Sequence, residues 1–539
     1  MSKWLFIFGI MVFMISPAGA DWSGTSGDLK VSYFPGTTGD FLSRFPRVRS
    51  GGGSILYSAW VQGKTFVPYE IFFSKSIDNG RNWTGSSADF RISADDGEGS
   101  LVSIDNPVDL VVWNQDNICV VWAESLTNVG FEVMLVNSTD GGDTWEHSDV
   151  DFPISFPGGP RALAPSIAAD NSGGLHVVWH QRADYDTTEI YYGYSSDGGA
   201  TWTSQTEDRI ISFADGRHAN YPAIAIDADD NVYVAWTERL EPTDITSTAV
   251  HYGIKLAGDT QFSSETQDLT AAMPHRSASV PSIAVGPDFA IHIAYEATND
   301  IGGSFKGAIY YTQSPDGGAT WSGNTQEVFV DLNPFDDTTS ADPTMIVTTA
   351  GNLAACYDHV DLSTGGRTEP RVSLSTDNGA TWSGNTLEEI VGHWETPGDN
   401  RPGYKPHMCV SDGDTLHVVW NEDCSDEGGS PGYYEIMYSR GDVLGISAPA
   451  CDYVVGDYNA NGMFNVADII AAFSYLQTGS PEAGYLCECP PGSGDEWAVA
   501  MDVNNTCAFN IADIIAGFSK LQTGSPDLVP CQECPPQGR

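Results

Sequence analysis

Residues 165–202, PSIAADNSGGLHVVWHQRADYDTTEIYYGYSSDGGATW, contain the unit from which the fold can be predicted. A strand led by Pro165 precedes a Gly-rich turn and a second, alternating strand that ends at Trp179. A third alternating strand leads into the turn SSDGGATW at residues 195–202, where Asp and Gly supply the turn chemistry. A fourth strand is expected after this turn. Four short strands in about sixty residues are typical of one β-propeller blade.

The unit recurs along the chain. Its Ser-x-Asp-x-Gly-x-x-Trp turn has five copies, which begin at Ser76, Ser138, Ser195, Ser314 and Ser375. The aromatic residue that ends the second strand has seven copies, spaced by 57 to 63 residues: Trp60, Trp122, Trp179, Trp236, Tyr295, Tyr357 and Trp420. The segment 29–33 reads as a fourth strand without a unit of its own, and the seventh copy stops after its third strand. We therefore predict an all-β, seven-bladed β-propeller whose N-terminal strand closes the last blade, which removes open sheet edges.

The Ser-x-Asp-x-Gly-x-x-Trp turns resemble the Asp-boxes, or BNR repeats, of the sialidase (neuraminidase) superfamily, and the resemblance covers roughly residues 28–440. It implies that the turns are structural and that the ligand face is opposite, where loops enter the first strand or join the second to the third. Arg44-Phe45-Pro46 resembles the family's Arg-Ile-Pro, and Tyr404 has a location suited to the nucleophile. The family has six blades, however, and no Glu partner for Tyr404 or early-loop Asp acid is found. An unperturbed phenol has a pKa near 10, so Tyr404 alone is a weak nucleophile.

The loops expected at the ligand face carry arginine and glutamate. Arg182 and Arg239 stand in equivalent places after the second strand of two copies. Guanidinium groups bind carboxylates in bidentate fashion, so an acidic sugar such as sialic or uronic acid would fit. The alternative is that these arginines form ordinary surface ion pairs, worth about 0–1 kcal/mol each. The candidate catalytic residue is Tyr404, and the candidate ligand-binding residues are Arg44, Arg161, Arg217, Arg276, Arg401, Glu124, Glu238 and Glu422.

The C-terminal segment carries two acidic loops, each followed by apolar residues at helical spacing. Oxygen side chains at loop positions 1, 3, 5, 9 and 12 are a Ca²⁺ ligand pattern. The duplicated Asn-x-x-Asp-Ile-Ile sequence resembles a type I dockerin, which implies a small α-helical calcium module and a cohesin-like or cell-surface partner. Cys507 replaces the turn glycine of the second loop, and a calcium-stapled cap without a cohesin is the alternative. The predicted calcium ligands are Asp457, Asn459, Asn461, Asn465, Asp468, Asp502, Asn504, Thr506, Asn510 and Asp513.

The ends and the cysteines indicate an exported protein. Residues 1–20 combine Lys3, a short apolar run and a small-residue cleavage site, as secretory signal peptides do. Six of the ten cysteines lie in the last 89 residues, which predicts a disulfide framework whose pairing the sequence leaves open. Cys119 and Cys356 share one strand position and are expected to be buried thiols. The expected domains are the signal peptide (1–20), the propeller (21–445) and the Cys-rich calcium-binding domain (446–539).

Composition narrows the choice of partners. The net charge of −48 opposes binding to nucleic acid or anionic lipid, and no apolar run is long enough to span a membrane. We expect a secreted monomer, tied to a surface or complex by its C-terminal module, whose propeller binds or cleaves an acidic carbohydrate. A non-catalytic protein-interaction propeller and an exo-sialidase-type glycoside hydrolase are the two alternatives.

Overall fold

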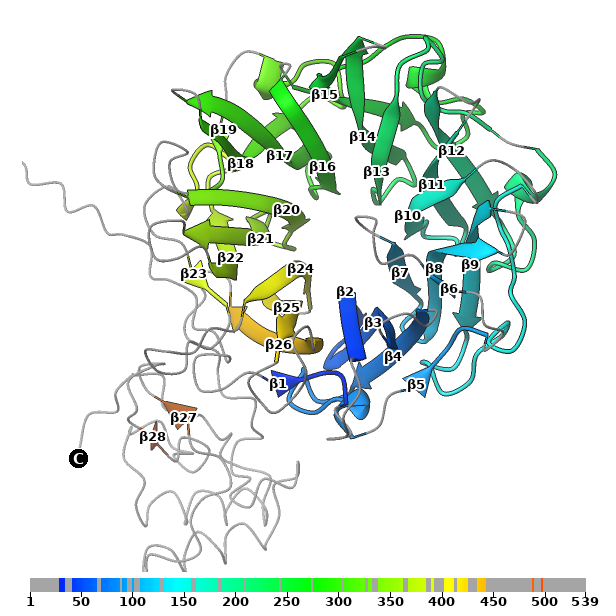
Figure 1. Ribbon diagram of the computed structural model, residues 1–539, viewed down its shortest axis with the longest axis vertical. Coiled ribbons are helices and arrows are strands. Elements are labelled where there is room, and N and C mark those ends of the chain that lie inside the picture. The colour runs from blue at the N-terminus through cyan, green and yellow to red at the C-terminus, as the bar shows by residue number, and fades with distance from the viewer. Residues whose placement is uncertain are drawn as a thin grey trace, which may run out of the picture. The chain divides into compact units, whose positions relative to one another are not determined.

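The computed structural model is nearly all β, with small antiparallel sheets and almost no helix, as the sequence predicts (Figure 1). Within the described residues the helices are single 3₁₀ turns at η2 (Thr84–Ser86), η3 (Thr203–Gln205), η4 (Ser263–Glu265) and η5 (Ser322–Asn324). The structure describes residues 29–33, 41–64, 69–87, 90–94, 99–100, 107–126, 130–156, 161–182, 187–207, 209–241, 244–272, 275–301, 304–324, 328–331, 338–361, 367–383, 389–391, 402–411, 414–424, 434–442, 487–488 and 496–497.

The first four sequence copies each fold into three consecutive antiparallel strands, with a short outer strand or bridge beside the third. The first set is β2 (Phe41–Gly52), β3 (Ile55–Lys64), β4 (Glu70–Ser76) and β5 (Phe90–Arg91). The second is β7 (Val108–Trp113), β8 (Asn117–Leu126) and β9 (Gly130–Ser138), with β6 (Gly99–Ser100) beside β8. The third is β10 (Ala162–Ala169), β11 (Leu175–Arg182) and β12 (Thr188–Ser195). The fourth is β13 (Ala219–Ile226), β14 (Val232–Glu241) and β15 (Asp244–Lys255).

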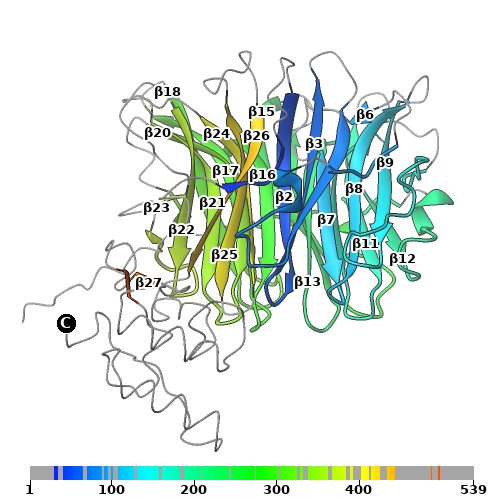
Figure 2. The ribbon, with the colours of Figure 1, turned by 90° about the horizontal axis from the view of Figure 1, so that it is seen from below.

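The remaining copies follow the same order of strands. The fifth set is β16 (His275–Val285), β17 (Ile291–Ile301), β18 (Ser304–Ser314) and β19 (Val328–Phe329). The sixth is β20 (Thr338–Val347), β21 (Leu353–Asp361), β22 (Arg367–Ser375) and β23 (Glu389–Ile390). The last is β24 (Gly403–Val410), β25 (Thr415–Asp423) and β26 (Tyr434–Asp442). The sets follow one another around a ring in Figure 1, and their strands run between the two ends of the ring in Figure 2.

The outer strand of the last set comes from the other end of the sequence. β1 (Leu29–Lys30) pairs antiparallel with β26, with Leu29 opposite Tyr438. The pairing continues in a hydrogen bond of 2.8 Å from Val31 N to Ile436 O, and Lys30 Nζ lies 2.8 Å from the Glu435 carboxylate. A short parallel bridge between Leu42 and Tyr434 also links β2 to β26. The beginning and end of the described ring therefore meet in one sheet.

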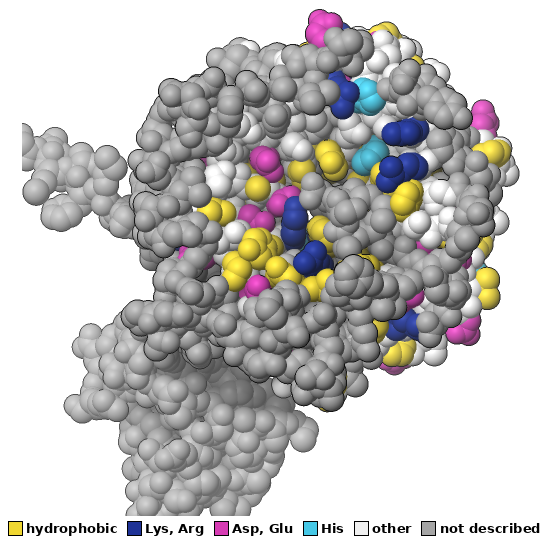
Figure 3. Space-filling model, in the orientation of Figure 1, with side chains coloured by type: hydrophobic (Ala, Val, Ile, Leu, Met, Phe, Trp, Pro, Cys, Tyr) yellow, Lys and Arg dark blue, Asp and Glu magenta, His cyan; other side chains and the backbone are white. Residues whose placement is uncertain are grey.

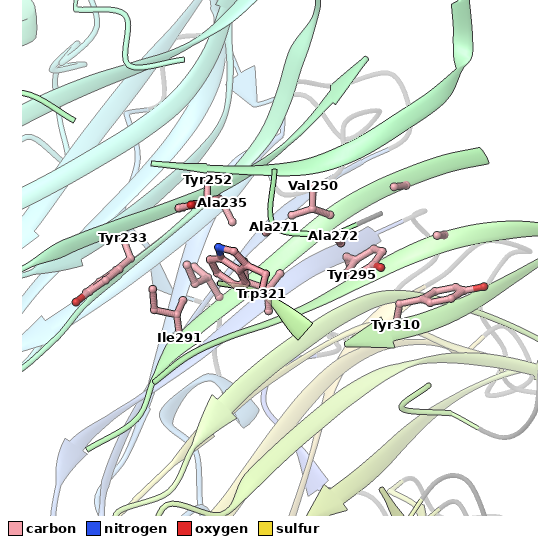
Figure 4. Close-up of a cluster of buried hydrophobic side chains, with 14 of the residues drawn as sticks. Tyr233, Ala235, Val250, Tyr252, Ala271, Ala272, Ile291, Tyr295, Tyr310 and Trp321 are labelled. Atoms are coloured by element: carbon pink, nitrogen blue, oxygen red, sulfur yellow. The ribbon is translucent and has the colours of Figure 1, made fainter. Parts of the chain in front are cut away.

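Apolar clusters fill the spaces between neighbouring sets. In Figure 4, Tyr233, Ala235, Val250 and Tyr252 of the fourth set face Ile291, Tyr295 and Tyr310 of the fifth, around Trp321. Cys119 and Cys356 are free, buried thiols in such clusters, which confirms the sequence-based expectation. No helix in the described part of the chain is long and apolar enough to cross a membrane.

The Ser-x-Asp-x-Gly-x-x-Trp turns have a structural role. In the second set the Ser138 hydroxyl donates to Asp140 (2.8 Å) and accepts from the Gly142 amide (2.9 Å), while Asp140 accepts from the Thr144 amide (2.9 Å). These hydrogen bonds to the carboxylate lower the pKa of Asp140 to about 2, the Thr144 side chain contributing most. In the first set the turn is bonded to the connection between the first two strands, through Asn79 N and Ser54 O at 2.8 Å. The turns therefore lie at the end of the ring opposite Arg44.

The chain divides into two compact units, Met1–Leu444 and Gly445–Arg539. In the second unit the structure describes only the antiparallel pair β27 (Cys487–Glu488) and β28 (Glu496–Trp497). The predicted signal peptide, the predicted helices of the calcium module and all ten predicted calcium ligands lie outside the described residues, as do most of the cysteines of the predicted disulfide framework.

Candidate functional site

The first strand of each described set contributes to the wall of one central cavity of about 480 Å³. These strands, here called the inner strands, are β2, β7, β10, β13, β16, β20 and β24, and each contributes to the cavity wall. Looking onto one end of the ring, Figure 3 shows basic, acidic and histidine side chains around its centre. We call the end where the inner strands begin the entry end.

Six inner strands carry the same β-bulge, one residue before the proline. That residue has a positive φ in each case: Phe45, Ala164, Tyr221, Val280, Asp342 and Lys405. The pairing register with the second strand shifts at the same point, for example between Asn220 and Ala223. A positive φ is uncommon for residues other than glycine and costs of order 1–3 kcal/mol. Three of the bulge residues, Val280, Asp342 and Lys405, line the central cavity.

A charged network covers one side of the cavity wall. Arg49 bridges neighbouring inner strands, with Nη2 3.1 Å from Asp109 Oδ1 and Nη1 2.8 Å from His407 Nε2. Asp109 also accepts from the Ser166 hydroxyl and the Ile167 amide, both at 3.1 Å. Burial, together with Arg49, holds the pKa of His407 well below its usual range. His407 is therefore a neutral member of this network at pH 7.

A second network contains a buried carboxyl group. Lys405 Nζ lies 2.6 Å from Asp342 Oδ2, and the Lys405 amide donates to Asp358 Oδ2 at 3.1 Å. Burial and the neighbouring Asp342 raise the pKa of Asp358 well above the usual range of a carboxyl. Because Asp342 and Lys405 line the cavity, this protonated carboxyl lies directly behind the wall.

The structure brings two of the predicted residues, Arg44 and Tyr404, into one aromatic cluster. The Arg44 guanidinium lies 4.6 Å from the ring centre of Tyr434, and the Tyr404 ring is 6.2 Å from the Tyr434 ring. Burial raises the pKa of Tyr404, which also has a side-chain hydrogen bond with Thr368. Tyr404 therefore keeps its proton at neutral pH and is suited to donating a hydrogen bond.

The three predicted glutamates are buried and share one local contact. Each accepts a hydrogen bond from the indole two residues earlier: Trp122 to Glu124 at 2.7 Å, Trp236 to Glu238 at 2.9 Å and Trp420 to Glu422 at 3.2 Å. Gln62 and Gln181 do the same in the first and third sets. Accepting a hydrogen bond from the buried indole is therefore a structural role of this position, in addition to the ligand-binding role that the sequence suggested.

The other predicted arginines do not converge on one point. Arg161 is exposed, with its guanidinium 4.5 Å from the ring centre of Phe131. Arg217 pairs with Asp268 at 2.8 Å and with Asp215 at 3.2 Å. Arg276 in β16 pairs through its backbone with Thr298 of β17, and its side chain is not described. Arg401 lies outside the described residues.

The sequence reading missed a histidine and a tyrosine near Arg161. Tyr221, a bulge residue, packs edge-on against the His180 ring at 5.6 Å, and its amide donates to His180 Nδ1 at 3.3 Å. Burial lowers the pKa of His180 to about 4, and the charge of Arg161 adds to this effect. Because Nδ1 accepts a hydrogen bond, the neutral ring carries its proton on Nε2. The two residues come from different copies of the repeat, so only the position of Tyr221 before an inner-strand proline hinted at this pair.

Comparisons with known proteins support the architecture. The sequence matches no protein-family model and no curated protein. Among solved structures, the chain is similar to a polysaccharide lyase described as an ulvan lyase, with a TM-score of 0.51, 15% identity, and coverage of 76% of this chain and 95% of that chain. An ulvan lyase structure bound to -[GlcA(1-4)Rha3S]- has a TM-score of 0.50, again with 15% identity and with coverage of 76% of this chain and 95% of that chain. A Hadza microbial sialidase has a TM-score of 0.42, 14% identity, and coverage of 72% of this chain and 73% of that chain. The structural neighbours are thus propeller-type folds of carbohydrate-active enzymes, and at this identity the likeness shows the fold alone.

Proposed function

We propose that the first unit is a seven-bladed β-propeller that binds an acidic polysaccharide at its entry end and cleaves it by β-elimination. The observation that carries the proposal is the exposed Arg161 guanidinium beside neutral His180 and Tyr221. A chain of net charge −48 repels a polyanion at long range, so binding one needs a local cationic site. Arg161, with the exposed Arg182 at the end of β11, supplies such a site.

The chemistry of the three side chains fits a uronate. A guanidinium binds a carboxylate through charge-assisted hydrogen bonds, and the Nε2 proton of His180 provides a further donor. Neutralising the carboxylate makes the neighbouring ring proton more acidic. In the proposed step the Tyr221 oxygen takes that proton while its own hydroxyl proton passes to the leaving oxygen. The carbon–oxygen bond to the leaving sugar breaks at the same time, and Tyr221 ends neutral, as it began. The electron pair of the broken C–H bond becomes the double bond of an unsaturated uronate.

The proposed substrate class is a uronate-containing polysaccharide. The ulvan lyase neighbour is bound to a disaccharide repeat that contains glucuronate, and we carry that class of ligand to this chain. The acidic sugar expected from the sequence is thus proposed to be a uronate, and a sialic acid is the less favoured ligand.

Matched variants test the proposal. Arg161→Ala is expected to weaken retention on an immobilised glucuronate polymer at least tenfold, and Tyr221→Phe is expected to abolish ultraviolet-absorbing unsaturated product while retention persists. Arg81→Ala removes the same charge from an exposed position in the turn at the opposite end and is expected to change neither. Unchanged retention in Arg161→Ala would refute the site and favour a protein-interaction propeller.

Hydrolysis is a second candidate reaction because of Asp358. A protonated carboxyl beside a second carboxyl is the pairing that glycoside hydrolases use as acid and base or nucleophile. Asp342 in the cavity wall and Asp358 behind it meet this description. Saturated reducing ends that disappear in Asp358→Asn, with no unsaturated product, would favour hydrolysis over elimination. An exo-sialidase would in addition release sialic acid and depend on Tyr404.

We further propose that residues 1–20 direct export and that the second unit is a dockerin-like anchor. The support is the sequence pattern: two loops with oxygen ligands at calcium spacing, each before helix-spaced apolar residues. In this proposal the anchor holds the propeller at a cell surface or in a complex through a cohesin-like partner. We expect the protein to bind the isolated partner only in the presence of calcium, and we expect Asp468→Ala to abolish this binding.

A further inference from the structure

Three potential metal-ligating side chains converge in the fourth set. Glu238 of β14, His251 of β15 and Asp268 after η4 each offer one ligand atom, and these atoms lie within 4.8 Å of one another. His251 Nδ1 is 2.6 Å from Asp268 Oδ1 and 3.6 Å from Glu238 Oε2. The three residues come from three neighbouring strands or segments, so an ion between them would cross-link the outer part of this set.

Two of the three side chains are buried with unused polar atoms. The side chains of Glu238 and His251 are each only 1% exposed. Glu238 Oε1 and His251 Nε2 have no hydrogen-bond partner in the described residues, whereas His251 Nδ1 contacts Asp268 Oδ1. A buried polar atom without a partner costs about 1–3 kcal/mol. Two such atoms in one cluster indicate that a further group completes it.

The charges around the cluster favour a bound cation. Asp215, Glu238 and Asp268 are three acidic residues, and Arg217 is the basic residue that pairs with them. Arg217 Nη1 binds Asp268 Oδ2 at 2.8 Å but remains 3.9 Å from Glu238 Oε1. When the three carboxylates are counted as ionised, one divalent cation balances the two negative charges that Arg217 leaves.

The neighbouring donors orient the carboxylates for metal binding. Arg217 holds Oδ2 of Asp268 and leaves Oδ1 beside the imidazole. Trp236 Nε1 donates to Oε2 of Glu238 at 2.9 Å, and this oxygen, which lies 3.6 Å from His251 Nδ1, keeps a second lone pair for a metal ion. Outer hydrogen bonds of this kind position the ligands of metal sites in proteins.

Comparison among the repeats shows that the fold does not require this histidine. His251 is paired with Trp236, and the residues paired with the corresponding aromatic in the other sets are Phe72, Met134, Tyr191, Tyr310, Arg371 and Met437. In the second and last sets a methionine is paired with the tryptophan, and the equivalent glutamate again accepts from the indole. The fourth set has added two ligands, His251 and Asp268, to a glutamate that the repeat already supplied.

We propose that Glu238, His251 and Asp268 bind a divalent transition-metal ion, with zinc as the best match. An imidazole with two carboxylates suits zinc, whereas calcium and magnesium prefer oxygen ligands alone. Ligand atoms about 2.0–2.2 Å from a tetrahedral zinc lie roughly 3.4 Å apart. The 3.6 Å separation of Nδ1 and Oε2 already fits, and Asp268, the most exposed of the three, must shift so that its 2.6 Å distance from Nδ1 lengthens by roughly 0.8 Å. The zinc proposal does not rest on the proposed glycan-binding function, because none of its three ligands is Arg161, His180 or Tyr221.

The test compares full-length wild type with variants that copy other repeats. His251→Tyr reproduces the third and fifth sets, and Glu238→Gln reproduces the first and third, where glutamine still accepts from the indole. After chelator treatment, the wild type is expected to bind one more equivalent of Zn²⁺ than either variant. Cobalt titration of the wild type is expected to give a visible absorption band that both variants lack.

Two results would overturn the proposal. One is equal zinc stoichiometry in the wild type and both variants, which would assign all binding to groups outside this cluster, such as the C-terminal cysteines. The other is an equal rise of Tm on adding zinc in all three proteins. If His251→Tyr fails to fold, Glu238→Gln decides, because it keeps the shape and the indole contact. A loss of one equivalent in that variant supports the site, and no loss refutes it.

Discussion

Gly80→Ala tests the contact between the last and the first sets of strands. Gly80 has a φ of +81° in the turn after β4, and a Cβ added there would lie 1.9 Å from the Tyr438 hydroxyl and 2.1 Å from Cζ. Tyr438 on β26 has little freedom to move, because it is fully buried and its hydroxyl lies 2.7 Å from His417 Nδ1 and 3.3 Å from Asn79 O. The substitution therefore introduces both backbone strain and a steric clash.

The two contributions can be separated with a matched glycine. An L-residue in the left-handed region costs about 1–2 kcal/mol, and overpacking a filled core typically costs about 1–3 kcal/mol more. Gly351, between β20 and β21, has a φ of +82° and open space around it, so Gly351→Ala carries the backbone cost alone. We expect a loss of unfolding free energy of about 2–5 kcal/mol for Gly80→Ala and about 1–2 kcal/mol for Gly351→Ala.

Urea unfolding followed by tryptophan fluorescence measures both variants, and thermal scans give the same order. At about 2.1 cal/mol/K of unfolding entropy per residue, a unit of this size loses roughly 1 °C of Tm per kcal/mol. Gly379→Ala is a second packed case, since its Cβ would lie 2.2 Å from the Tyr311 hydroxyl. Equal losses for Gly80→Ala and Gly351→Ala would refute the reasoning, because Tyr438 would then not abut the first set.

Two further predictions concern pH and calcium. Burial lowers the pKa of His292 to about 4 and that of His417 to about 3, whereas an unfolded histidine titrates near 6.5. As the pH drops, the unfolded chain therefore takes up protons before the folded one, and the free energy of unfolding falls between about pH 6.5 and pH 4. The urea midpoint is expected to fall between pH 7 and pH 4.5, with a smaller fall in His292→Gln; an equal fall would contradict this assignment. EDTA is expected to lower the Tm of the second unit in the full-length protein and to have no effect on that transition in a variant with Asp468→Ala and Asp513→Ala. An unchanged transition in the wild type would count against the calcium loops.

The strand pattern was predictable because each copy repeats the residues that begin and end its strands. A proline leads the inner strand, an aromatic residue ends the second strand, and Asp and Gly form the outer turn. These signals act locally, so a single sequence contains them. The pairing of β1 with β26 was also foreseeable, because an unpaired strand at one end matched a missing strand at the other.

The contacts of the candidate site were harder to predict. Residues two apart on a strand point to the same side, so Glu124 and Trp122 had to be neighbours, and a buried indole needs an acceptor. The presence of Gln62 and Gln181 at the same position was the available signal for this structural contact. His180 and Tyr221 meet across two sets, and nothing in either local sequence encodes that distance.

The bulges of the inner strands explain why the fold is easier to read from the sequence than the site. A residue before proline prefers extended backbone with negative φ, so no propensity rule predicts six positive-φ residues at this position. The backbone shape is shared by the six strands, but the side chain that it presents is different in each. In the sixth and last sets it gives the ion pair of Asp342 and Lys405, and in the fourth it gives Tyr221 against His180. Because the repeat determines the place of these residues and not their chemistry, the specificity of the entry end depends on the identities of a few residues on a constant frame.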